Sequence, residues 1–395
     1  NYINRLKKLG TKYGWPDQHG GQRVDSGVAI ITQSSNIMIN LTMQKRGLPI
    51  GYAVTAGNQA QLGLAELATN IVKDTRVTAL GLYVEGLGSI RNFEKLVSLC
   101  DELGKAIVVI KIGKSEHAQL SAVSHTASLA GNDKGASALM KRLGVARVNS
   151  LSEFIETLKV FHCHGRLSGS SVASVSCSGG EASLIADICN GSQLVFPKLT
   201  KEQTNGLNSA LGAKVALANP LDYHTYIWGD AGKMAQTFIS IMQDKNIDIG
   251  IIIVDFPRSD FCDPDAWNCV VEAAVLTKKA VKKPIALMST LAENIEESVA
   301  KDLMTKNLIP LCGMDEGLAA IVAASTQKSD LDIVNHPVIL PNNNKSACLL
   351  NEANSKRLLS EIGVDTPRNV VVKNRELLTN LPLVFPVVIK ALGLA

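Results

Sequence analysis

The residues best suited to chemistry lie in a short polar stretch, Ser124–Gly131, which carries His125 among small and hydroxylic neighbours. A neutral imidazole is a competent nucleophile near pH 7, and small neighbours leave room for an anion beside the ring. The stretch comes a short loop after the apolar run Ala106–Ile112. Such a run is typical of a strand buried on both faces of a parallel sheet, and ligands bind at the carboxyl ends of such strands. We therefore expect His125 to be catalytic; the alternative is a partly buried histidine that caps a helix.

Two loops of one kind are candidate anion sites. Free amide N–H groups and the helix dipole at a helix N-terminus favour a phosphate by ~0.3–2 kcal/mol. The alternative is ordinary N-cap chemistry, for which Ser and Gly are common. Each loop joins a strand-like run to a helix: Val28–Thr32 leads into Ser34 and Ser35, and Val172–Ser176 leads into Ser178, Gly179 and Gly180.

The elements that must position these residues form two series of alternating strands and helices. The first series predicts strands over Val28–Thr32, Ile50–Val54, Ala79–Val84, Ala106–Ile112 and Ala146–Val148, with crossover helices within Gln61–Lys73 and Ile90–Leu103. The second predicts strands over Val172–Ser176, Lys214–Leu217, Asp248–Val254, Pro284–Met288 and Leu308–Leu311. Repeated βα units of this kind predict an α/β fold with two consecutive doubly wound parallel-sheet domains.

The C-terminal segment has a different pattern, which begins after the polar stretch Thr326–Asn344. It predicts an amphipathic helix over Leu349–Ile362, a strand over Val370–Lys373 and another strand-like run at Phe385–Lys390. Because one helix and two strands cannot bury a core, we expect the opening of a further domain. The chain also starts without Met, and we interpret it as a piece of a longer polypeptide. The predicted domains are 1–22, 23–167, 168–334 and 335–395.

Composition argues against several classes of protein. The chain has 395 residues and a net charge of +4, with acidic and basic residues interleaved. Without a basic stripe interleaved with aromatics, nucleic acid is not an expected partner, and no apolar run is long enough to span a membrane. The eight cysteines show no CxxC pair or framework spacing, which predicts reduced thiols in a cytoplasmic protein. The tract His162–His164 is interpreted as a helix end before Gly165, because adjacent residues converge poorly on one metal ion. No metal site is predicted.

Four further residues are weaker candidates. Cys177 precedes a predicted helix, where thiol pKa values fall, so a reactive cysteine is conceivable. Asp222 and His224 follow Pro220 and either line a substrate pocket or hold the turn. Asp255 follows an apolar strand, where a domain interface and a substrate contact are equally consistent with the sequence.

As an ordered set, these motifs resemble the NDP-forming (ADP-forming) acyl-CoA synthetases, a group that includes ADP-forming acetate–CoA ligase and is related to succinyl-CoA synthetase. The resemblance covers nearly the whole chain and implies flavodoxin-like sheets. The motifs that carry it are Ile31–Ser35, Ala56–Asn58, Tyr83–Gly86, Ser124–Gly131, Ser178–Gly180, Asn219–Asp222 and Pro386–Lys390.

The resemblance implies that ATP and CoA are substrates and that a phosphoryl group passes from the nucleotide to a histidine, which matches His125. It then passes to an acyl carboxylate, and the thiol of CoA attacks the acyl phosphate. The family's orienting glutamate matches Glu85, which ends the strand Ala79–Val84 and can accept the proton on the second ring nitrogen. In the alternative, Glu85 is a solvated strand end or pairs with Lys111 or Lys114.

The two helix N-termini match the phosphohistidine-binding loops, which meet the phosphoryl charge with backbone amides and without side-chain cations. Lys390 matches the ATP-grasp lysine that contacts nucleotide phosphates. Asn58 and Asp222 are further predicted to contact the substrate.

There are departures from the family pattern. Residues 1–22 look like the trailing edge of a CoA-binding domain that is otherwise missing, and 335–395 look like the truncated start of an ATP-grasp domain. The Mg²⁺ ligands of the family fall outside the chain, so we do not expect it to complete the reaction alone. Ala127 stands where many relatives have glycine.

We therefore predict an acid–thiol ligase that makes an acyl-CoA from a small carboxylic acid, CoA and ATP, as a homo-oligomer. One alternative is a non-catalytic, ligand-sensing module like the synthetase-like part of some protein acetyltransferases, which would not need His125. A second alternative is a two-lobed binding protein for an anionic metabolite. Lys390 argues against this alternative, because such a protein would not need a residue that matches the ATP-grasp lysine. The sequence leaves open which acid is used, and whether the nucleotide is ATP or GTP.

Overall fold

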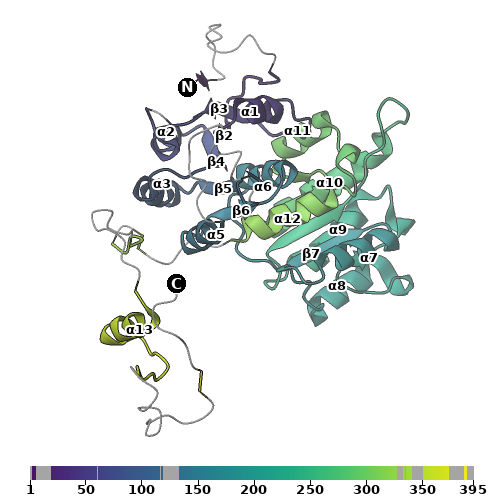
Figure 1. Cartoon of the computed structure of the whole chain (residues 1–395). Helices are drawn as coiled ribbons and strands as arrows, with labels where there is room; N and C mark the ends of the chain where they lie inside the picture. Colours follow the sequence, from purple (N-terminus) through teal and green to yellow (C-terminus); the bar gives the residue numbers. More distant parts are fainter. Residues whose placement is uncertain are drawn as a thin grey trace. The chain divides into compact units, whose positions relative to one another are not determined.

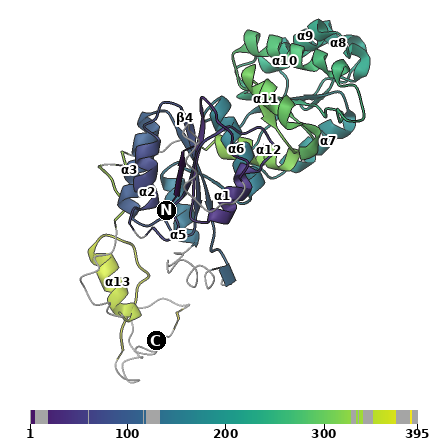
Figure 2. The same ribbon diagram turned by 90° about the horizontal axis from the view of Figure 1, so that it is seen from above.

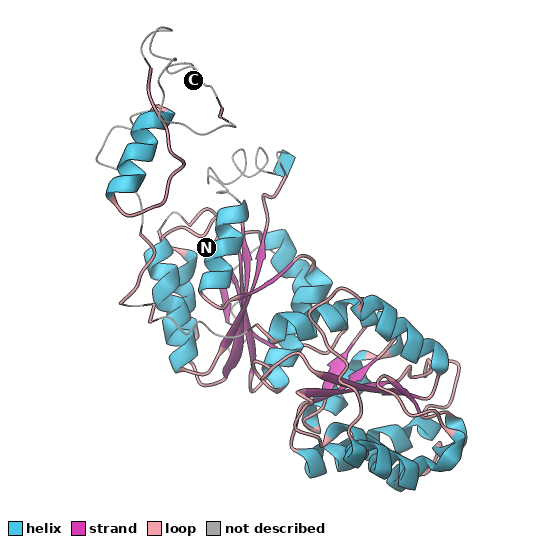
Figure 3. Cartoon of the chain, turned by 90° about the horizontal axis from the view of Figure 1, so that it is seen from below, coloured by secondary structure: helices cyan, strands magenta, loops and turns pink. Residues whose placement is uncertain are grey.

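The computed structural model describes residues 2–5, 19–59, 61–115, 117–118, 133–326, 332–333, 335–339, 350–372 and 387–388. The chain divides into two compact units, Asn1–Val338 and Ile339–Ala395. The first unit holds two sheets with helices on both faces, which Figure 3 shows clearly. The alternation of β-branched runs with helical stretches had predicted this α/β architecture, and it is confirmed.

The first sheet is parallel except at one edge. Its strands, in spatial order, are β1 (Tyr2–Arg5), β3 (Ile50–Thr55), β2 (Gly27–Thr32), β4 (Val77–Val84), β5 (Ala106–Lys111) and β6 (Ala146–Val148). The edge strand β1 runs antiparallel to β3, a pairing that the sequence did not suggest. The helices that follow these strands are α1 (Ser35–Thr42), α2 (Leu64–Ile71), α3 (Ile90–Glu102), α5 (Asp133–Arg142) and α6 (Leu151–Cys163) (Figure 1).

Side chains of successive strand residues point to opposite faces, so each apolar run contributes to two cores. Ile30 and Val108 pack on the face covered by α1 and α6. Ile31 and Val109 pack on the other face, against α2, α3 and α5. Burial on both faces explains why these runs are continuously apolar rather than alternating.

The second sheet is parallel throughout. Its strands, in spatial order, are β11 (Ile309–Leu311), β10 (Ile285–Met288), β9 (Ile249–Ile253), β7 (Val172–Ser176) and β8 (Leu221–Asp222). Its helices are α7 (Gly179–Cys189), α8 (Lys201–Leu211), α9 (Ala231–Met242), α10 (Asn268–Val281), α11 (Glu297–Thr305) and α12 (Met314–Ala324).

The prediction of a strand over Lys214–Leu217 was wrong. Lys214 ends a 3-10 turn, Gly212–Lys214, and the chain first pairs with β7 at Leu221. The physical reason is Asn219, whose side chain occupies the neighbouring part of the β7 edge. Its Oδ1 accepts from the backbone N–H of Ser174 at 3.1 Å, and its Nδ2 donates to the carbonyl of Val172 at 2.8 Å. A side-chain amide therefore takes the place of a strand backbone at this edge.

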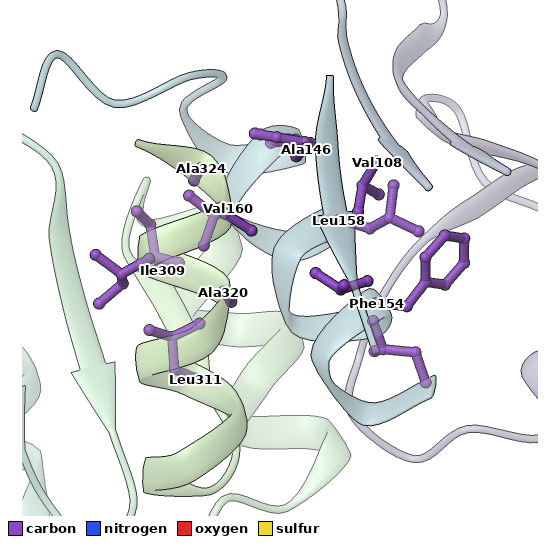
Figure 4. Packing of buried hydrophobic residues seen from close by; sticks show 14 of the residues in the cluster. Val108, Ala146, Phe154, Leu158, Val160, Ile309, Leu311, Ala320 and Ala324 are labelled. Atoms are coloured by element: carbon purple, nitrogen blue, oxygen red, sulfur yellow. The ribbon is translucent and has the colours of Figure 1, made fainter. Parts of the chain in front are cut away.

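The two sheets share a hydrophobic core. Helix α6 covers the first sheet and α12 covers the second, and these two helices lie side by side in Figures 1 and 2. Figure 4 shows this core: Val160 of α6 lies near Ala320 and Ala324 of α12, whereas Phe154 and Leu158 lie toward Val108 of the first sheet. Because the core is continuous, the two sheets are joined through packed side chains.

The described part of the second unit contains one helix, α13 (Glu352–Glu361). The side chain of Asn351 caps this helix by accepting from the N–H of Asn354 at 2.9 Å. The helix predicted over Leu349–Ile362 is thus present, with shorter ends. The strand predicted over Val370–Lys373 is not found in its described residues, 370–372, which have irregular backbone. The described residues of the second unit include no strand that could supply ladder hydrogen bonds to them.

Candidate functional site

His125 and Lys390, two of the predicted site residues, lie outside the described residues. The described elements that flank the segment carrying His125 are β5, before it, and α5, which begins at Asp133. The elements around the carboxyl ends of the neighbouring strands therefore define the described part of the candidate site.

Gln33 binds the backbone around Glu85. Its Oε1 accepts from the N–H groups of Glu85, at 2.5 Å, and Gly86, at 3.0 Å. Gln33 follows β2 and Glu85 follows β4, the neighbouring strand. The contact therefore fixes where the glutamate leaves the sheet. Sequence reasoning missed Gln33, which stands between two residues of the predicted loop.

Glu85 is half-buried, and its Oε2 is fully buried with no hydrogen-bond partner among the described residues. The alternative ion pairs with Lys111 and Lys114 are not formed in this part of the chain. Lys111 donates to the carbonyl of Ile112 and Lys114 donates to Asn149 Oδ1, both at 2.5 Å. A buried carboxylate oxygen with an unused lone pair is costly unless a donor reaches it.

The first predicted anion loop is a strand-to-helix turn held by hydroxyl groups. Thr32 Oγ1 donates to the carbonyl of Ser34 at 2.7 Å, and Ser34 Oγ accepts from the N–H of Ile37 at 3.4 Å. Ser34 is therefore the N-cap of α1. Ser35 is exposed in the first turn, where backbone N–H groups have no partner within the helix. Helix α1 has no acidic residue in that turn.

The second predicted loop repeats this construction at β7. Ser176 Oγ donates to the carbonyl of Ser178 at 2.6 Å and accepts from its N–H at 3.0 Å. Ser178 is the N-cap of α7, but its side chain makes no capping hydrogen bond. Gly179 and Gly180 are exposed in the first turn. Thr32 and Ser176 thus play the same role in the two sheets, two residues before each N-cap.

The electrostatic surroundings of the two loops differ. Glu181 stands in the first turn of α7. Burial, together with Asp255 and Asp222, raises the pKa of this glutamate, whereas a hydrogen bond with Ser176 opposes the shift. Carboxylates near a helix N-terminus compete with a bound anion for the same positive potential. The second loop is therefore the less favourable of the two for a phosphate.

Cys177 lies beside these acidic groups, and its surroundings do not favour the reactive thiol that its place before a helix had made conceivable. Burial and the neighbouring Glu181 raise the pKa of Cys177 above its ordinary value. The helix N-terminus favours a thiolate, but desolvation and negative neighbours outweigh it here.

Asp222 holds the turn after β8. Its Oδ1 accepts from the N–H of His224 at 2.8 Å, and its Oδ2 lies 3.5 Å from Nδ1 of the same histidine. This backbone contact stabilises the positive φ of 56° at His224. The carboxylate also lies beside α7, since a side chain at Gly179 would come within 3.1 Å of Asp222 Oδ2.

Asp255 joins the loops that follow β9 and β10. Its carboxylate accepts from the N–H and hydroxyl of Thr290, at 2.9 and 2.8 Å, and from Asn294 Nδ2 at 2.9 Å. These contacts hold two loops together at the carboxyl edge of the second sheet.

Asn58 lies exposed on the turn after β3, between Gly57 and Gln59, which both have positive φ. Gln59 connects this turn to the site, because its Nε2 donates to the carbonyl of Gly86 at 3.0 Å. Its Oε1 accepts from the N–H of Leu64 at the start of α2, at 2.7 Å. Gln33 thus accepts from the N–H groups of Glu85 and Gly86 while Gln59 donates to the Gly86 carbonyl, a long-range arrangement with no local sequence signal.

The histidine tract closes α6, as predicted: the helix ends at Cys163, and Gly165 has a φ of 89°. His162 Nδ1 lies 2.8 Å from Thr78 Oγ1, and burial lowers the pKa of His162. Within the described ranges, no group of three or more His, Cys, Asp or Glu residues could hold a metal ion. Nor does any described helix combine the length and apolarity that a membrane span requires.

Comparison with known proteins agrees with this architecture. Residues 25–161 match the family described as succinyl-CoA ligase like flavodoxin domain. The chain is 28% identical to the alpha subunit of acetate–CoA ligase [ADP-forming] II of Pyrococcus furiosus, over 76% of this chain and 65% of that protein. It is 23% identical to trans-feruloyl-CoA synthase FCS1 of an unknown prokaryotic organism, over 99% of this chain and 55% of that protein. The chain therefore spans less than two thirds of either relative.

Solved structures show the same fold. Dinucleotide-forming acetyl-coenzyme A synthetase 1 of Ca. Korarchaeum cryptofilum, in complex with phosphate and ADP, matches with a TM-score of 0.63 and 20% identity over 77% of this chain and 65% of that one. PH0766 from Pyrococcus horikoshii OT3 matches with a TM-score of 0.63 and 21% identity over 80% of this chain and 66% of that one.

Proposed function

Because this chain is related to the ADP-forming acyl-CoA synthetases, and its residues 25–161 match the succinyl-CoA ligase flavodoxin domain, we propose that it acts in an acid–thiol ligase. The γ-phosphoryl group of ATP passes to a ring nitrogen of His125, and ADP leaves. A carboxylate oxygen of the acid then attacks phosphorus, which frees His125 and forms an acyl phosphate. The CoA thiol loses its proton and attacks the acyl carbon, and phosphate leaves.

The observation that carries the proposal is the buried Oε2 of Glu85, which has no hydrogen-bond partner among the described residues. Gln33 holds this glutamate at the edge of the sheet from which the His125 segment departs. In the proposed site, Oε2 accepts the N–H of the second imidazole nitrogen. This contact directs the lone pair of the first nitrogen toward phosphorus and stabilises the charge that develops on the ring.

The two loops are assigned different tasks. The loop at Ser34 and Ser35 binds the phosphoryl group while it is bonded to His125, since no acidic residue stands in the first turn of α1. The loop at Ser178, Gly179 and Gly180 serves the other position of the phosphoryl group, which it holds more weakly beside Glu181. A weaker second site suits a group that must be passed on.

The nucleotide is assigned to the segment around Lys390, and Asn58 and Asp222 to the acid. The proposal also requires CoA and Mg²⁺. The described residues do not form a magnesium site, and no step above is assigned to the metal.

The test uses the full-length protein with radiolabelled ATP and Mg²⁺. We expect acid-labile label on His125, which His125→Ala abolishes. The matched control is His117→Ala, which removes an exposed histidine from the preceding turn and should leave labelling unchanged. The labelled protein is then offered CoA and a panel of short, branched and aromatic acids, and thioesters are detected by mass spectrometry.

Label that survives in the His125→Ala variant would rule out the mechanism. Absence of both label and thioester in the full-length protein would favour the ligand-sensing alternative. Aromatic acids belong in the panel because one relative is named for a feruloyl substrate.

A further inference from the structure

Three polar side chains, two buried and one half-buried, lie at the ends of three neighbouring strands of the first sheet. Gln33 follows β2, Glu85 follows β4 and Lys111 ends β5, and the spatial order of these strands is β2-β4-β5. Gln33 is only 5% exposed and Lys111 only 3%. Side chains this polar are rarely buried unless their hydrogen-bonding groups are satisfied.

Lys111 is incompletely satisfied. Its Nζ carries three N–H groups and donates one hydrogen bond, to the carbonyl of Ile112 at 2.5 Å, among the described residues. Burial lowers the pKa of Lys111, with Asp133 and Glu85 acting in the opposite direction and Arg147 adding to the lowering. An anion at this position would offset the cost of burying the ammonium group.

The nearest carboxylates do not supply that anion. Asp133 is paired with the guanidinium of Arg147, which also donates to the Asp133 carbonyl at 3.4 Å. Glu85 makes no ion pair with Lys111 in the described part of the chain. Within the described ranges, the ammonium of Lys111 therefore has a single acceptor, the backbone carbonyl of Ile112.

Gln33 is incompletely satisfied as well. Since its Oε1 accepts from two backbone N–H groups, the orientation of the amide is fixed and Nε2 must be the other atom. This Nε2 is buried and has no acceptor among the described residues. A buried donor without an acceptor costs about 1–3 kcal/mol, so a ligand oxygen here would be favourable.

We propose that Lys111 Nζ and Gln33 Nε2 bind the oxygens of a phosphoryl group at the carboxyl edge of the first sheet. This inference rests on the proposed function and deepens it. It replaces the expectation that backbone amides alone meet the phosphoryl charge. The two donors follow or end β2 and β5, and the acceptor Glu85 Oε2 follows β4, the strand between them. Two donors for oxygen and one acceptor for an N–H are the set that a phosphorylated imidazole requires.

The experiment measures binding of inorganic phosphate to the chain by isothermal titration calorimetry, without nucleotide or CoA. Lys111→Met is expected to raise the Kd of the tighter phosphate site at least tenfold. The matched control is Lys105→Met, because Lys105 lies at the opposite end of β5, is half-buried and donates to the carbonyls of Val72 and Asp74. This control should change the Kd less than twofold.

A second variant guards against misfolding of the first. Gln33→Glu keeps an oxygen for the Glu85 and Gly86 N–H groups but replaces the donor Nε2 with an oxygen. It should weaken phosphate binding at least as much as Lys111→Met, with an unchanged circular dichroism spectrum. Unchanged phosphate affinity in both variants, an equal loss in Lys105→Met, or no phosphate binding by the unmodified chain would each overturn the inference.

Acetate is titrated in parallel to distinguish the source of the anion. If Lys111→Met and Gln33→Glu weaken acetate binding and leave phosphate binding unchanged, the site belongs to the acid substrate and the inference is wrong. The outcome is separate from the labelling test, because phosphate binding is measured without turnover. If His125 is labelled but Lys111→Met leaves the Kd for phosphate unchanged, this inference alone is wrong. If Lys111→Met raises the Kd for phosphate but His125 is not labelled, the proposed function alone is wrong.

Discussion

Glu85 is held through its backbone, while one oxygen of its side chain has no partner in the described structure. These two facts concern different parts of the same residue. The backbone contact sets the position of the carboxylate, and the unpartnered oxygen sets what it can accept. Alone, a glutamate at a strand end is as consistent with a solvated surface as with catalysis. The contact with Gln33 and the burial of Oε2 distinguish Glu85 from a fully solvated strand end.

We predict that Glu85→Gln slows phosphorylation of His125 by about 10²–10⁴-fold. The substitution keeps the size of the side chain but can present an amide N–H where the acceptor Oε2 was, so the second imidazole nitrogen loses its partner. Rapid-quench labelling of the full-length protein measures the rate. Glu102→Gln, at an exposed position at the end of α3, is the control and should label at the normal rate. A normal rate in Glu85→Gln would make the carboxylate structural.

The cysteines provide a prediction with a pH dependence. Burial and Glu181 raise the pKa of Cys177, and burial raises the pKa of Cys100 to about 12. Since the thiolate is the reactive form, both should resist iodoacetamide at pH 7, and Cys177 should gain reactivity as the pH rises above the ordinary thiol pKa. The exposed Cys262 should react first. Peptide mass spectrometry at pH 7 and 9 measures how fast each cysteine is alkylated. Rapid labelling of Cys177 at pH 7 would contradict the prediction.

At the scale of elements, the two sheets use one device to begin a helix. A hydroxyl residue ends the strand, and two residues later a serine caps the helix. The bond from Thr32 or Ser176 to the serine carbonyl holds the turn from inside. The first turn of the helix then presents its N–H groups outward at the carboxyl edge of the sheet.

Helix α6 packs directly on strand β4, and Gly81 makes this possible. A Cβ at Gly81 would lie 2.5 Å from Phe154 Cζ and 2.9 Å from Leu158 Cδ1. We predict that Gly81→Ala lowers the free energy of unfolding by about 1–3 kcal/mol, because the side chains of α6 must shift within a packed core. Urea unfolding measures the change.

The control for this prediction is Gly51→Ala in strand β3 of the same sheet. A Cβ there would meet only ordinary contacts, the nearest at 3.6 Å. Gly51→Ala should lower the free energy of unfolding clearly less than Gly81→Ala does. Equal costs would mean that glycine matters for the strand backbone rather than for the approach of α6.

At the scale of the whole first unit, a buried charge cluster reinforces the shared core. Glu156 and Lys159 of α6 form an ion pair at 2.8 Å, and both side chains are fully buried. Glu156 also accepts from Arg46, at 3.0 Å, and from the N–H of Cys312, at 2.9 Å. Arg46 in turn pairs with Glu316 of α12 at 3.0 Å. The cluster thus joins the loop after α1 to the second sheet.

We predict that Glu156→Gln lowers the free energy of unfolding by about 3–5 kcal/mol, because it leaves Lys159 charged and buried without a carboxylate partner. The two sheets should still unfold in one transition, since their core is continuous. The comparison variant is Arg258→Met, which removes an exposed pair with Asp260 and should leave the melting temperature unchanged. Two separate calorimetric transitions, or equal effects of both variants, would contradict this account.

Local patterns in the sequence determined much of the fold. Strands such as Val172–Ser176 and Ala146–Val148 agree with the structure to the residue, because continuous apolar runs bounded by polar turns leave little choice of conformation. The strand–turn–helix form of both candidate anion loops was also predicted, since N-cap chemistry depends on residues a few positions apart. The error at Lys214–Leu217 arose where a side chain, Asn219, took a place that local pattern assigns to backbone.

Only the tertiary structure showed which residues far apart in the sequence form hydrogen bonds and ion pairs with each other. Gln33 reaches Glu85 across 52 positions and Arg46 reaches Glu156 across 110, and no spacing rule connects such residues. The direction of the Cys177 pKa shift likewise depended on which carboxylates packed beside it. Hydrophobic periodicity and capping act over one or two helical turns, so the sequence alone specified the elements and the kinds of loop. Burial and long-range contacts arise when elements pack, so packing alone determined which polar atoms were left without partners.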